Sequence, residues 1–379
     1  MHSGSTASRF LVIKLADLGD VLTTTPALRA LRLRYPTAVI DVLTTRTGAE
    51  ALDGLDSLDH LITFEKSAFD HLPPTPGAVL QALHLGVRLR RARYDRVFLL
   101  HHLFTRGGRI KYAALLAATG SPWRGGVAEG RPRFLTHVYP EAGYGVCHEA
   151  DYWLGVVGLA GARNPSPRLE ITVTEHERTR ARQLLAELDR EPARPIIALY
   201  PGAGPYSPAR RWPVDRYAAV GQRLIASLGA RVLVVGGPTE RGLGERIRLI
   251  AGSAVQNLAG CTDVKTLAAV LERCDLLIGN DGGVMHLAVA VGTPVAAIFG
   301  PSNDISWGPY GGVRWEPGRS ARTVVLRADL PCAPCLYRGF LPGLRYGCPS
   351  RDCLRGVTVD AVVRAAMEVL ALGRPGRLG

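Results

Sequence analysis

The fold of this chain is decided by the stretch Leu276-Leu277-Ile278-Gly279-Asn280-Asp281-Gly282-Gly283-Val284-Met285-His286-Leu287. An apolar run stops at a glycine-rich turn and a second apolar run follows, which predicts a buried strand, a turn and the start of a helix. The next predicted strand, Pro294 to Phe299, completes a unit that places nucleotides at the carboxyl edge of a parallel sheet. A Gly-rich turn alone is a weak sign of a binding site, so the rest of the chain has to support it.

The side chains and glycines of this stretch suit a nucleotide. Gly282 and Gly283 allow backbone N–H groups to come close to a ligand, and the helix presents its positive N-terminal end to the same point. Asp281 offers a carboxylate that can accept hydrogen bonds from a ribose diol, and His286 lies one turn into the helix.

Length and composition indicate a globular protein of two domains. The chain has 379 residues, with 47% apolar and 21% charged residues, and this length suits two domains of roughly 150–200 residues each. No apolar run approaches the ~18 residues of a membrane span, and the N-terminus lacks the pattern of a signal peptide. We therefore expect a soluble, cytoplasmic protein.

The formal net charge of +13 calls for an anionic partner. Nucleic acid, an anionic membrane face and a phosphorylated substrate remain open on charge alone, and an arginine-rich genome is the alternative that needs no partner. No recognisable nucleic-acid module accompanies the charge, so we expect no nucleic acid to bind. Peripheral association with the inner face of the cytoplasmic membrane is compatible with it.

Strands alternate with helices through the first half of the chain, which predicts a parallel, doubly wound sheet. The predicted strands are Arg9–Lys14, Val39–Leu43, Leu61–Phe64 and Val97–Leu100. Asp20 lies in the loop after the first strand, at the carboxyl edge where open α/β proteins bind ligands. A loop aspartate more often caps a helix than takes part in catalysis, so the position alone leaves its role open.

The second half offers a site for a diphosphate. The predicted strand Ile196 to Tyr200 ends in a turn of small residues, Pro201 to Gly204, and Arg210 and Arg211 follow. Backbone N–H groups of such a turn bind phosphate oxygens, and guanidinium groups neutralise their charge.

Several motifs together resemble glycosyltransferase family 9, the ADP-heptose:lipopolysaccharide heptosyltransferase family. G-N-D-G-G-V-M-H-L, then G-T-P-V-A-A-I-F-G-P-S and W-G-P-Y-G, are similar to its C-terminal signature, and L-G-D-V-L-T-T-T-P-A-L is similar to its first loop. The resemblance implies an α/β chain with the GT-B fold, in which two Rossmann-like domains face a central cleft. It implies an acceptor domain over residues 1–190, a nucleotide-sugar domain over 191–356, and a helix with a tail over 357–379 that returns toward the first domain.

The resemblance also assigns residues. It implies that Asp20 is the general base, and that the donor is bound by Arg210, Arg211, Glu240, Thr262, Asp281, Gly282, Gly283 and His286. The sequence departs from the family pattern at two points. Ala16-Asp17 replaces a Ser/Thr pair, and Gly282 stands where most members have Ser or Thr, so hydroxyl contacts there are missing.

The function implied is inverting transfer of a heptosyl or related unit from ADP-heptose to an acceptor hydroxyl, in lipopolysaccharide core or related glycoconjugate synthesis. The sequence contains no Asp-x-Asp motif, so we expect no catalytic metal and no cofactor, with the arginines stabilising the leaving ADP. The alternatives are a sugar-nucleotide epimerase of similar architecture, a transferase with another nucleotide sugar or a small-molecule acceptor, and a non-enzymatic basic binding module.

Three further groups have competing interpretations. Arg106, Arg109 and Arg124 either bind an anionic glycolipid or sugar acceptor or form a solvated face, and His101 and His102 are interpreted as hydrogen-bonded loop histidines without a metal. The spacing Cys332-x2-Cys335-x12-Cys348-x4-Cys353 fits a structural zinc site, with reduced thiols as the alternative.

Overall fold

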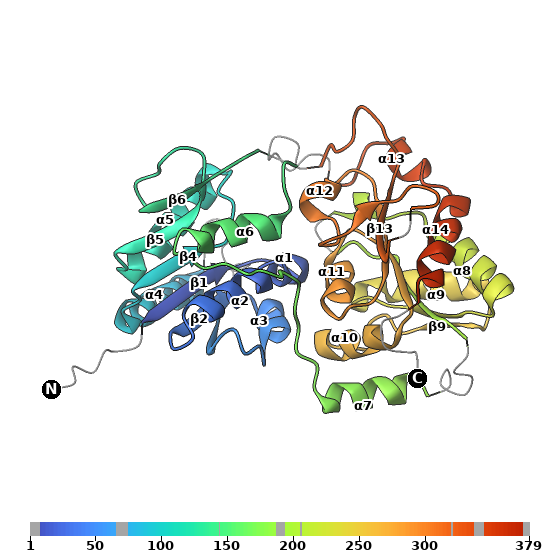
Figure 1. Ribbon diagram of the computed structural model, residues 1–379, viewed down its shortest axis with the longest axis horizontal. Coiled ribbons are helices and arrows are strands. Elements are labelled where there is room, and N and C mark those ends of the chain that lie inside the picture. Colours follow the sequence, from blue (N-terminus) through green and yellow to red (C-terminus); the bar gives the residue numbers. More distant parts are fainter. Residues whose placement is uncertain are drawn as a thin grey trace. The chain divides into compact units, whose positions relative to one another are not determined.

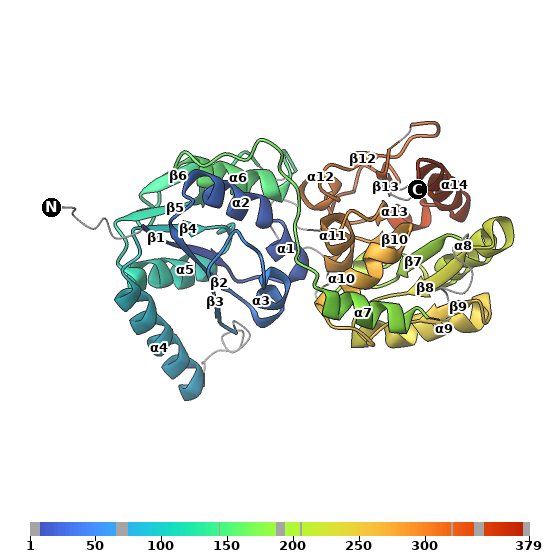
Figure 2. The ribbon, with the colours of Figure 1, turned by 60° about the horizontal axis from the view of Figure 1, so that its bottom comes forward.

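The chain forms two compact units. The structure, a computed structural model, describes residues 8–65, 75–143, 145–186, 194–204, 207–319, 321–336 and 345–373. Unit 1 holds Met1–Gly143 and Glu149–Glu170, and unit 2 holds Ile171–Gly379 with a short piece that ends at His148. Figures 1 and 2 show one sheet in each unit, with helices packed around it.

Unit 1 is built on six parallel strands in the order β3-β2-β1-β4-β5-β6. The strands are β1 Arg9–Lys14, β2 Val39–Thr44, β3 His60–Thr63, β4 Arg96–Leu99, β5 Trp123–Ala128 and β6 His137–Pro140. The four predicted strands are confirmed to within a residue at each end. β5 and β6 were not predicted, because a Gly-Gly pair interrupts the first and a proline ends the second.

The described part of unit 1 contains the helices α1 Leu18–Leu22, α2 Thr25–Arg34, α3 Arg46–Leu52, α4 Pro76–Ala92, α5 Arg106–Thr119 and α6 Glu149–Gly158. The N-terminal residue before α3, α4 and α5 is a threonine whose hydroxyl accepts a backbone N–H of the first turn. Such caps satisfy N–H groups that have no partner within the helix, and they fix where each helix begins.

Unit 2 is built on seven parallel strands in the order β12-β13-β11-β10-β7-β8-β9. The strands are β7 Ile196–Tyr200, β8 Arg231–Val234, β9 Val255–Asn257, β10 Leu276–Asn280, β11 Val295–Phe299, β12 Val313–Arg314 and β13 Thr323–Arg327. All residues of β7, β8, β10 and β11 are buried, as expected for a parallel sheet covered on both faces.

The helices of unit 2 are α7 Glu175–Leu184, α8 Val214–Leu228, α9 Arg241–Ala251, α10 Val264–Arg273, α11 Gly283–Ala290, α12 Asp304–Trp307, α13 Asp352–Arg355 and α14 Val359–Ala371, with short 3-10 turns η2 Pro208–Arg210 and η3 Pro238–Glu240. The predicted strand, turn and helix of the deciding stretch are confirmed as β10 and α11. β10 lies between β7 and β11, next to the strand that precedes the predicted diphosphate turn.

The last helix, α14, is part of the core of unit 2. Its side chains Val362, Ala365, Ala366 and Val369 are buried in the same hydrophobic cluster as strands β7, β10 and β11. These four side chains form an apolar stripe along the helix. The structure shows that α14 packs on the sheet of unit 2. The expectation that this helix returns toward the first domain stays a prediction.

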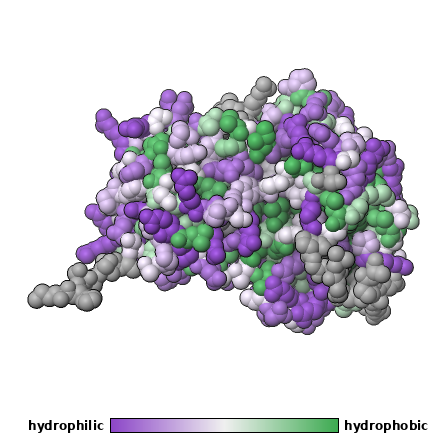
Figure 3. All heavy atoms as spheres, viewed as in Figure 1, coloured by the Kyte–Doolittle hydropathy of each residue, from purple (hydrophilic) through white to green (hydrophobic). Residues whose placement is uncertain are grey.

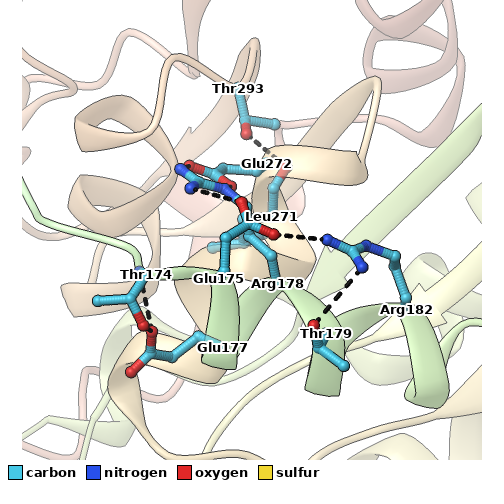
Figure 4. Close-up of polar contacts among 9 residues, drawn as sticks. All are labelled: Thr174, Glu175, Glu177, Arg178, Thr179, Arg182, Leu271, Glu272 and Thr293. Carbon is cyan, nitrogen blue, oxygen red and sulfur yellow. Dashed lines mark hydrogen bonds and ion pairs between the residues drawn. The ribbon is translucent and has the colours of Figure 1, made fainter.

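The boundary between the units lies before α7 and not at residue 190. In Figure 4, Arg178 of α7 points to Glu272 of α10, and its Nε lies 2.9 Å from a carboxylate oxygen. A capping box opens α7, with the Thr174 N–H donating to the Glu177 carboxylate over 2.8 Å. Because α7 packs on α10, it belongs to the second unit.

The face drawn in Figure 3 intersperses hydrophilic and hydrophobic residues over both units. Within the described residues, no helix is both long and apolar enough to cross a membrane.

Candidate active site

Asn280 organises the carboxyl edge of the second sheet. Its fully buried side chain accepts hydrogen bonds from the Trp212 N–H (3.0 Å) and the Tyr217 hydroxyl (2.9 Å). It donates to the carbonyl oxygens of Pro201 (3.0 Å) and Gly202 (2.9 Å). The end of β10 is thereby tied to the loop after β7 and to the start of α8. Sequence reasoning missed this role, although an amide at the end of an apolar strand is a signal for it.

Asp281 and Arg210 form a buried ion pair at the same edge. The Arg210 Nη1 lies 3.2 Å from Asp281 Oδ2, and the two side chains are 16% and 6% exposed. Arg210 also donates to the Ala203 carbonyl oxygen. The structure therefore brings together the predicted turn after β7, one of the two arginines and the predicted ribose carboxylate.

Arg211 and Glu240 form a second, looser pair. Arg211 Nη2 lies 3.5 Å from Glu240 Oε1, and Glu240 is buried at the end of the η3 turn. The other oxygen of Glu240 accepts the Gly237 N–H over 2.9 Å, which fixes the carboxylate in place. Arg211 retains 28% exposure, so its guanidinium can still meet a ligand.

Tyr200 explains why Gly282 carries no side chain. A Cβ on Gly282 would lie 2.9 Å from the Tyr200 hydroxyl oxygen, and a Cβ on Gly202 would lie 2.7 Å from the same ring. The space that a serine or threonine would occupy at position 282 is therefore taken by Tyr200. Burial raises the pKa of the Tyr200 phenol, which stays protonated.

His286 is a buried, neutral imidazole in the first turn of α11. Its Nδ1 has no hydrogen-bond partner among the described residues. Burial, with the charges of His148 and Arg210, lowers the pKa of His286 to about 3. The His148 ring lies 6.3 Å away and its Nε2 is 2.8 Å from the Gly308 carbonyl oxygen. Sequence reasoning missed His148 as a neighbour of this predicted donor residue.

The remaining predicted donor residues lie in the same unit. Gly283 begins α11, directly after the N-terminal cap at Gly282. Thr262 lies in the loop before α10, and its hydroxyl is buried without a hydrogen-bond partner in the described part of the chain. Buried polar atoms without a partner are uncommon in folded proteins and suit a ligand contact.

In unit 1, Asp20 lies in the short helix α1 and not in a loop as predicted. Its side chain is 34% exposed, and its Oδ1 lies 3.9 Å from the ammonium group of Lys14 at the end of β1. Lys14 is 2% exposed and stands 4.1 Å from the centre of the Trp153 ring. Trp153 in turn donates to the Thr23 hydroxyl over 3.0 Å. Sequence reasoning missed Lys14, although a charged residue at the end of a buried strand indicates a functional position at the edge of the sheet.

His102 lies between two carboxylates near the end of β4. Its Nδ1 is 2.6 Å from Glu141 and its Nε2 is 3.2 Å from Glu149, and all three side chains are nearly buried. Burial opposes the charged imidazole, but Glu149 and Glu141 outweigh it and raise the pKa of His102 to about 9. A hydrogen-bonded histidine was predicted here, whereas a buried ion cluster that includes Glu149 was not.

The predicted acceptor arginines have partly structural roles. Arg106 and Arg109 lie in the first turn of α5, and Arg109 donates to the Leu103 carbonyl oxygen over 2.8 Å. Arg124 in β5 donates to the carbonyl oxygens of Phe134 (2.8 Å) and Ser121 (2.5 Å). Arg124 therefore holds its own loop, and acceptor binding by these residues stays a prediction.

The four C-terminal cysteines gather near the loop after β11. The Cys335 N–H donates to the Pro301 carbonyl oxygen over 2.9 Å, and Cys353 lies against Gly300. Burial, with the neighbouring thiols Cys332 and Cys348, raises the pKa of Cys335. No disulfide joins any of the seven cysteines in the structure, and the reduced-thiol interpretation stays a prediction. In the described parts of the chain no three His, Cys, Asp or Glu side chains are arranged to hold a metal, so zinc stays a prediction from spacing.

Two parallel Rossmann-like sheets, each with polar groups at its carboxyl edge, are the architecture of the GT-B fold. The structure of E. coli ADP-heptose lps heptosyltransferase II matches with a TM-score of 0.71 and 24% identity, over 96% of this chain and 99% of that one. E. coli heptosyltransferase WaaC with ADP matches with a TM-score of 0.69 and 18% identity, over 95% and 99%.

The chain belongs to glycosyltransferase family 9 (heptosyltransferase), whose sequence profile matches residues 82–339. It is 28% identical over 320 residues to lipopolysaccharide heptosyltransferase 2 of Salmonella typhimurium, which covers 78% of this chain and 83% of the relative. The enzyme of the same name from E. coli K12 is 28% identical over 306 residues, with the same coverage. The family named from the sequence motifs is thus confirmed, and with it the glycosyltransferase class.

Proposed function

We propose that this chain transfers a heptosyl unit from ADP-heptose to a hydroxyl group of a lipopolysaccharide core acceptor. The observation that carries the proposal is the pair of arginines held by buried carboxylates at the carboxyl edge of unit 2, Arg210 with Asp281 and Arg211 with Glu240. The names of the relatives, which are lipopolysaccharide heptosyltransferases, support the choice of donor and acceptor.

The donor binds to unit 2. The diphosphate takes the backbone turn after β7 and the guanidinium of Arg211, since a charge-assisted contact of this kind is strong when it is partly shielded from water. Asp281 and Glu240 accept from sugar hydroxyls of the nucleotide, and the unpartnered Nδ1 of His286 supplies a further neutral contact. Because His286 is uncharged at neutral pH, it does not bind phosphate as a cation.

Asp20 of unit 1 acts as the general base. Its carboxylate removes the proton of the acceptor hydroxyl as the oxygen attacks the anomeric carbon, and the bond from that carbon to ADP breaks with inversion. The ammonium of Lys14 lies 3.9 Å from this carboxylate and attracts it electrostatically. The contact of the Lys14 ammonium with the face of the Trp153 ring stabilises this position of the cation.

The leaving ADP gains negative charge as the glycosidic bond breaks. We propose that Arg210, Arg211 and the N-terminal end of α11 stabilise this charge without a divalent ion, because fixed positive groups near a developing anion lower the barrier. No cofactor takes part in this scheme. The acceptor is a glycolipid of the cytoplasmic membrane face, bound by unit 1.

A product assay tests the proposal. The full chain is incubated with ADP-heptose and a panel of truncated lipopolysaccharide cores, and the products are measured by mass spectrometry together with released ADP. The proposal expects one acceptor that gains the mass of a heptosyl unit, with one ADP released per transfer. An isomerised nucleotide sugar without ADP release would point to an epimerase and would contradict it.

A further inference from the structure

Helix α4 of unit 1 has two apolar faces. Its inner face carries Ala78, Leu85 and Leu89, which are buried against the sheet and α5. Its outer side exposes four large apolar side chains: Val79 (41% exposed), Leu80 (54%), Leu83 (62%) and Val87 (49%). Figure 2 shows α4 along the border of unit 1.

The outer apolar residues form one stripe. At 100° per residue, positions 79, 80, 83 and 87 fall within an arc of about 100°, on the side away from the buried positions. Exposed apolar residues scattered singly are normal on a protein surface, but a contiguous stripe along a helix marks a surface that meets an apolar partner.

The charges of α4 indicate what the partner is. The helix, P-G-A-V-L-Q-A-L-H-L-G-V-R-L-R-R-A, contains no acidic residue and ends with Arg88, Arg90 and Arg91. An apolar stripe with arginines and without carboxylates is typical of helices that lie in the interface of an anionic bilayer. In a second copy of the chain the same face would offer no carboxylate to these arginines, so self-association lacks charge complementarity.

An apolar cavity continues from α4 toward the proposed base. It has a volume of about 440 Å³ between α4 and α5, and it is lined by apolar residues such as Ala82, Leu85 and Leu115, with Lys111 and Tyr112 at one side. Burial raises the pKa of the Tyr112 phenol, and the charge of the nearby Asp20 carboxylate raises it further. The helix, the cavity and Asp20 thus follow one another within unit 1.

We propose that α4 is a membrane-docking helix whose outer face rests in the headgroup region of an anionic phospholipid bilayer. This proposal deepens the proposed function, since a glycolipid acceptor is presented at a membrane surface. The role of the helix in reaching the acceptor rests on the proposed function, whereas its binding to a bilayer does not. The stripe supplies apolar burial, and the arginines at the end of the helix meet lipid phosphates.

The test is co-sedimentation of the full chain with vesicles. We expect binding to phosphatidylcholine vesicles that contain about 30 mol% phosphatidylglycerol, and weaker binding to phosphatidylcholine alone. The double variant Leu80→Asp, Leu83→Asp should lose at least about tenfold in vesicle affinity, because two apolar contacts are replaced by charges that anionic lipid repels.

A matched variant and two controls keep the result specific. Leu249 of α9 is 71% exposed, and Leu249→Asp should leave vesicle binding unchanged. The melting temperature and ADP binding of all variants should equal those of the wild type. The proposal is overturned if the wild type ignores anionic vesicles, if Leu249→Asp weakens binding equally, or if the double variant instead converts a dimer to a monomer.

Failure of this proposal is distinguishable from failure of the proposed function. Heptosyl transfer to a detergent-dispersed core without vesicle binding would refute the docking helix alone. Vesicle binding through α4 without any heptosyl transfer would leave the docking helix in place and refute the transferase assignment.

Discussion

The carboxyl edges of the two sheets surround their buried histidines with opposite charges. His102 in unit 1 lies between Glu141 and Glu149, and its pKa rises to about 9. His286 in unit 2 faces His148 and Arg210, and its pKa falls to about 3. Burial lowers both values, so the neighbouring charges account for the difference. The carboxylates around His102 therefore hold it as a cation, whereas His286 stays neutral beside positive groups that attract an anion.

The two carboxylates that we assign to the reaction differ in their exposure and in the distance to their charged partner. Asp20 is 34% exposed and 3.9 Å from its lysine, whereas Asp281 is 6% exposed and 3.2 Å from its arginine. A loosely paired, partly exposed carboxylate can reach a substrate proton, while a buried and tightly paired one has a fixed place. We infer that Asp20 acts in the chemical step and Asp281 in positioning the nucleotide.

Replacing Asp20 should produce the largest effect. Asp20→Asn removes the base without changing the volume of the side chain, and turnover should fall by about 10²–10⁴-fold. The exposed neighbour Asp17, at the N-terminal end of α1, gives the matched variant Asp17→Asn, which should keep its turnover. Steady-state rates measure both. An Asp20→Asn enzyme as fast as the wild type would remove Asp20 from the mechanism.

Replacing Arg211 should affect binding more than chemistry. Arg211→Ala removes a charge-assisted contact worth about 1.5–3 kcal/mol, so ADP affinity should fall by roughly 10- to 150-fold. Arg246 of α9 pairs with Asp215 at the surface, and Arg246→Ala serves as the control. Calorimetric titration with ADP compares the two. Equal affinities would mean that the diphosphate does not meet Arg211.

His102 predicts how the stability of unit 1 depends on pH. Its pKa is about 9 in the folded chain against an ordinary value of 6.5, so the stabilisation is fully present below about pH 6.5 and is lost as the pH rises through about 9. The melting temperature should fall across this range by a few degrees.

His102→Gln should flatten this dependence, and His84→Gln, at an exposed position of α4, should leave it intact. Differential scanning calorimetry at several pH values makes the comparison. An unchanged pH dependence in His102→Gln would show that the two glutamates do not stabilise a charged imidazole.

Removal of divalent metal ions should have no effect on the transfer rate. If arginines stabilise the leaving ADP, EDTA leaves the transfer rate unchanged. A rate that disappears with EDTA and returns with Mg²⁺ or Mn²⁺ would contradict the arginine account. A loss of fold that only zinc restores would instead support a structural site at the cysteines near the loop after β11.

The sequence predicted the strand, turn and helix from Leu276 to Leu287 because apolar runs and glycines are local signals. It did not predict the pairs between Lys14 and Asp20 or between His102 and its two glutamates, because these depend on how distant segments meet. The replacement of a hydroxyl at Gly282 by the ring of Tyr200 is of the same kind. Patterns along the chain identify edges of sheets, whereas packing determines the partners at those edges.

The most direct test of the account compares the binding of ADP to Asp281→Asn and Asp20→Asn by calorimetry. It asks whether Asp281 binds the nucleotide and Asp20 acts only on the acceptor. We predict that Asp281→Asn weakens ADP by about tenfold, because Arg210 loses its partner and the ribose loses an acceptor. Asp20→Asn should bind ADP as the wild type does, since its carboxylate acts on the acceptor. Wild-type affinity in Asp281→Asn, or a comparable loss in Asp20→Asn, would contradict the account.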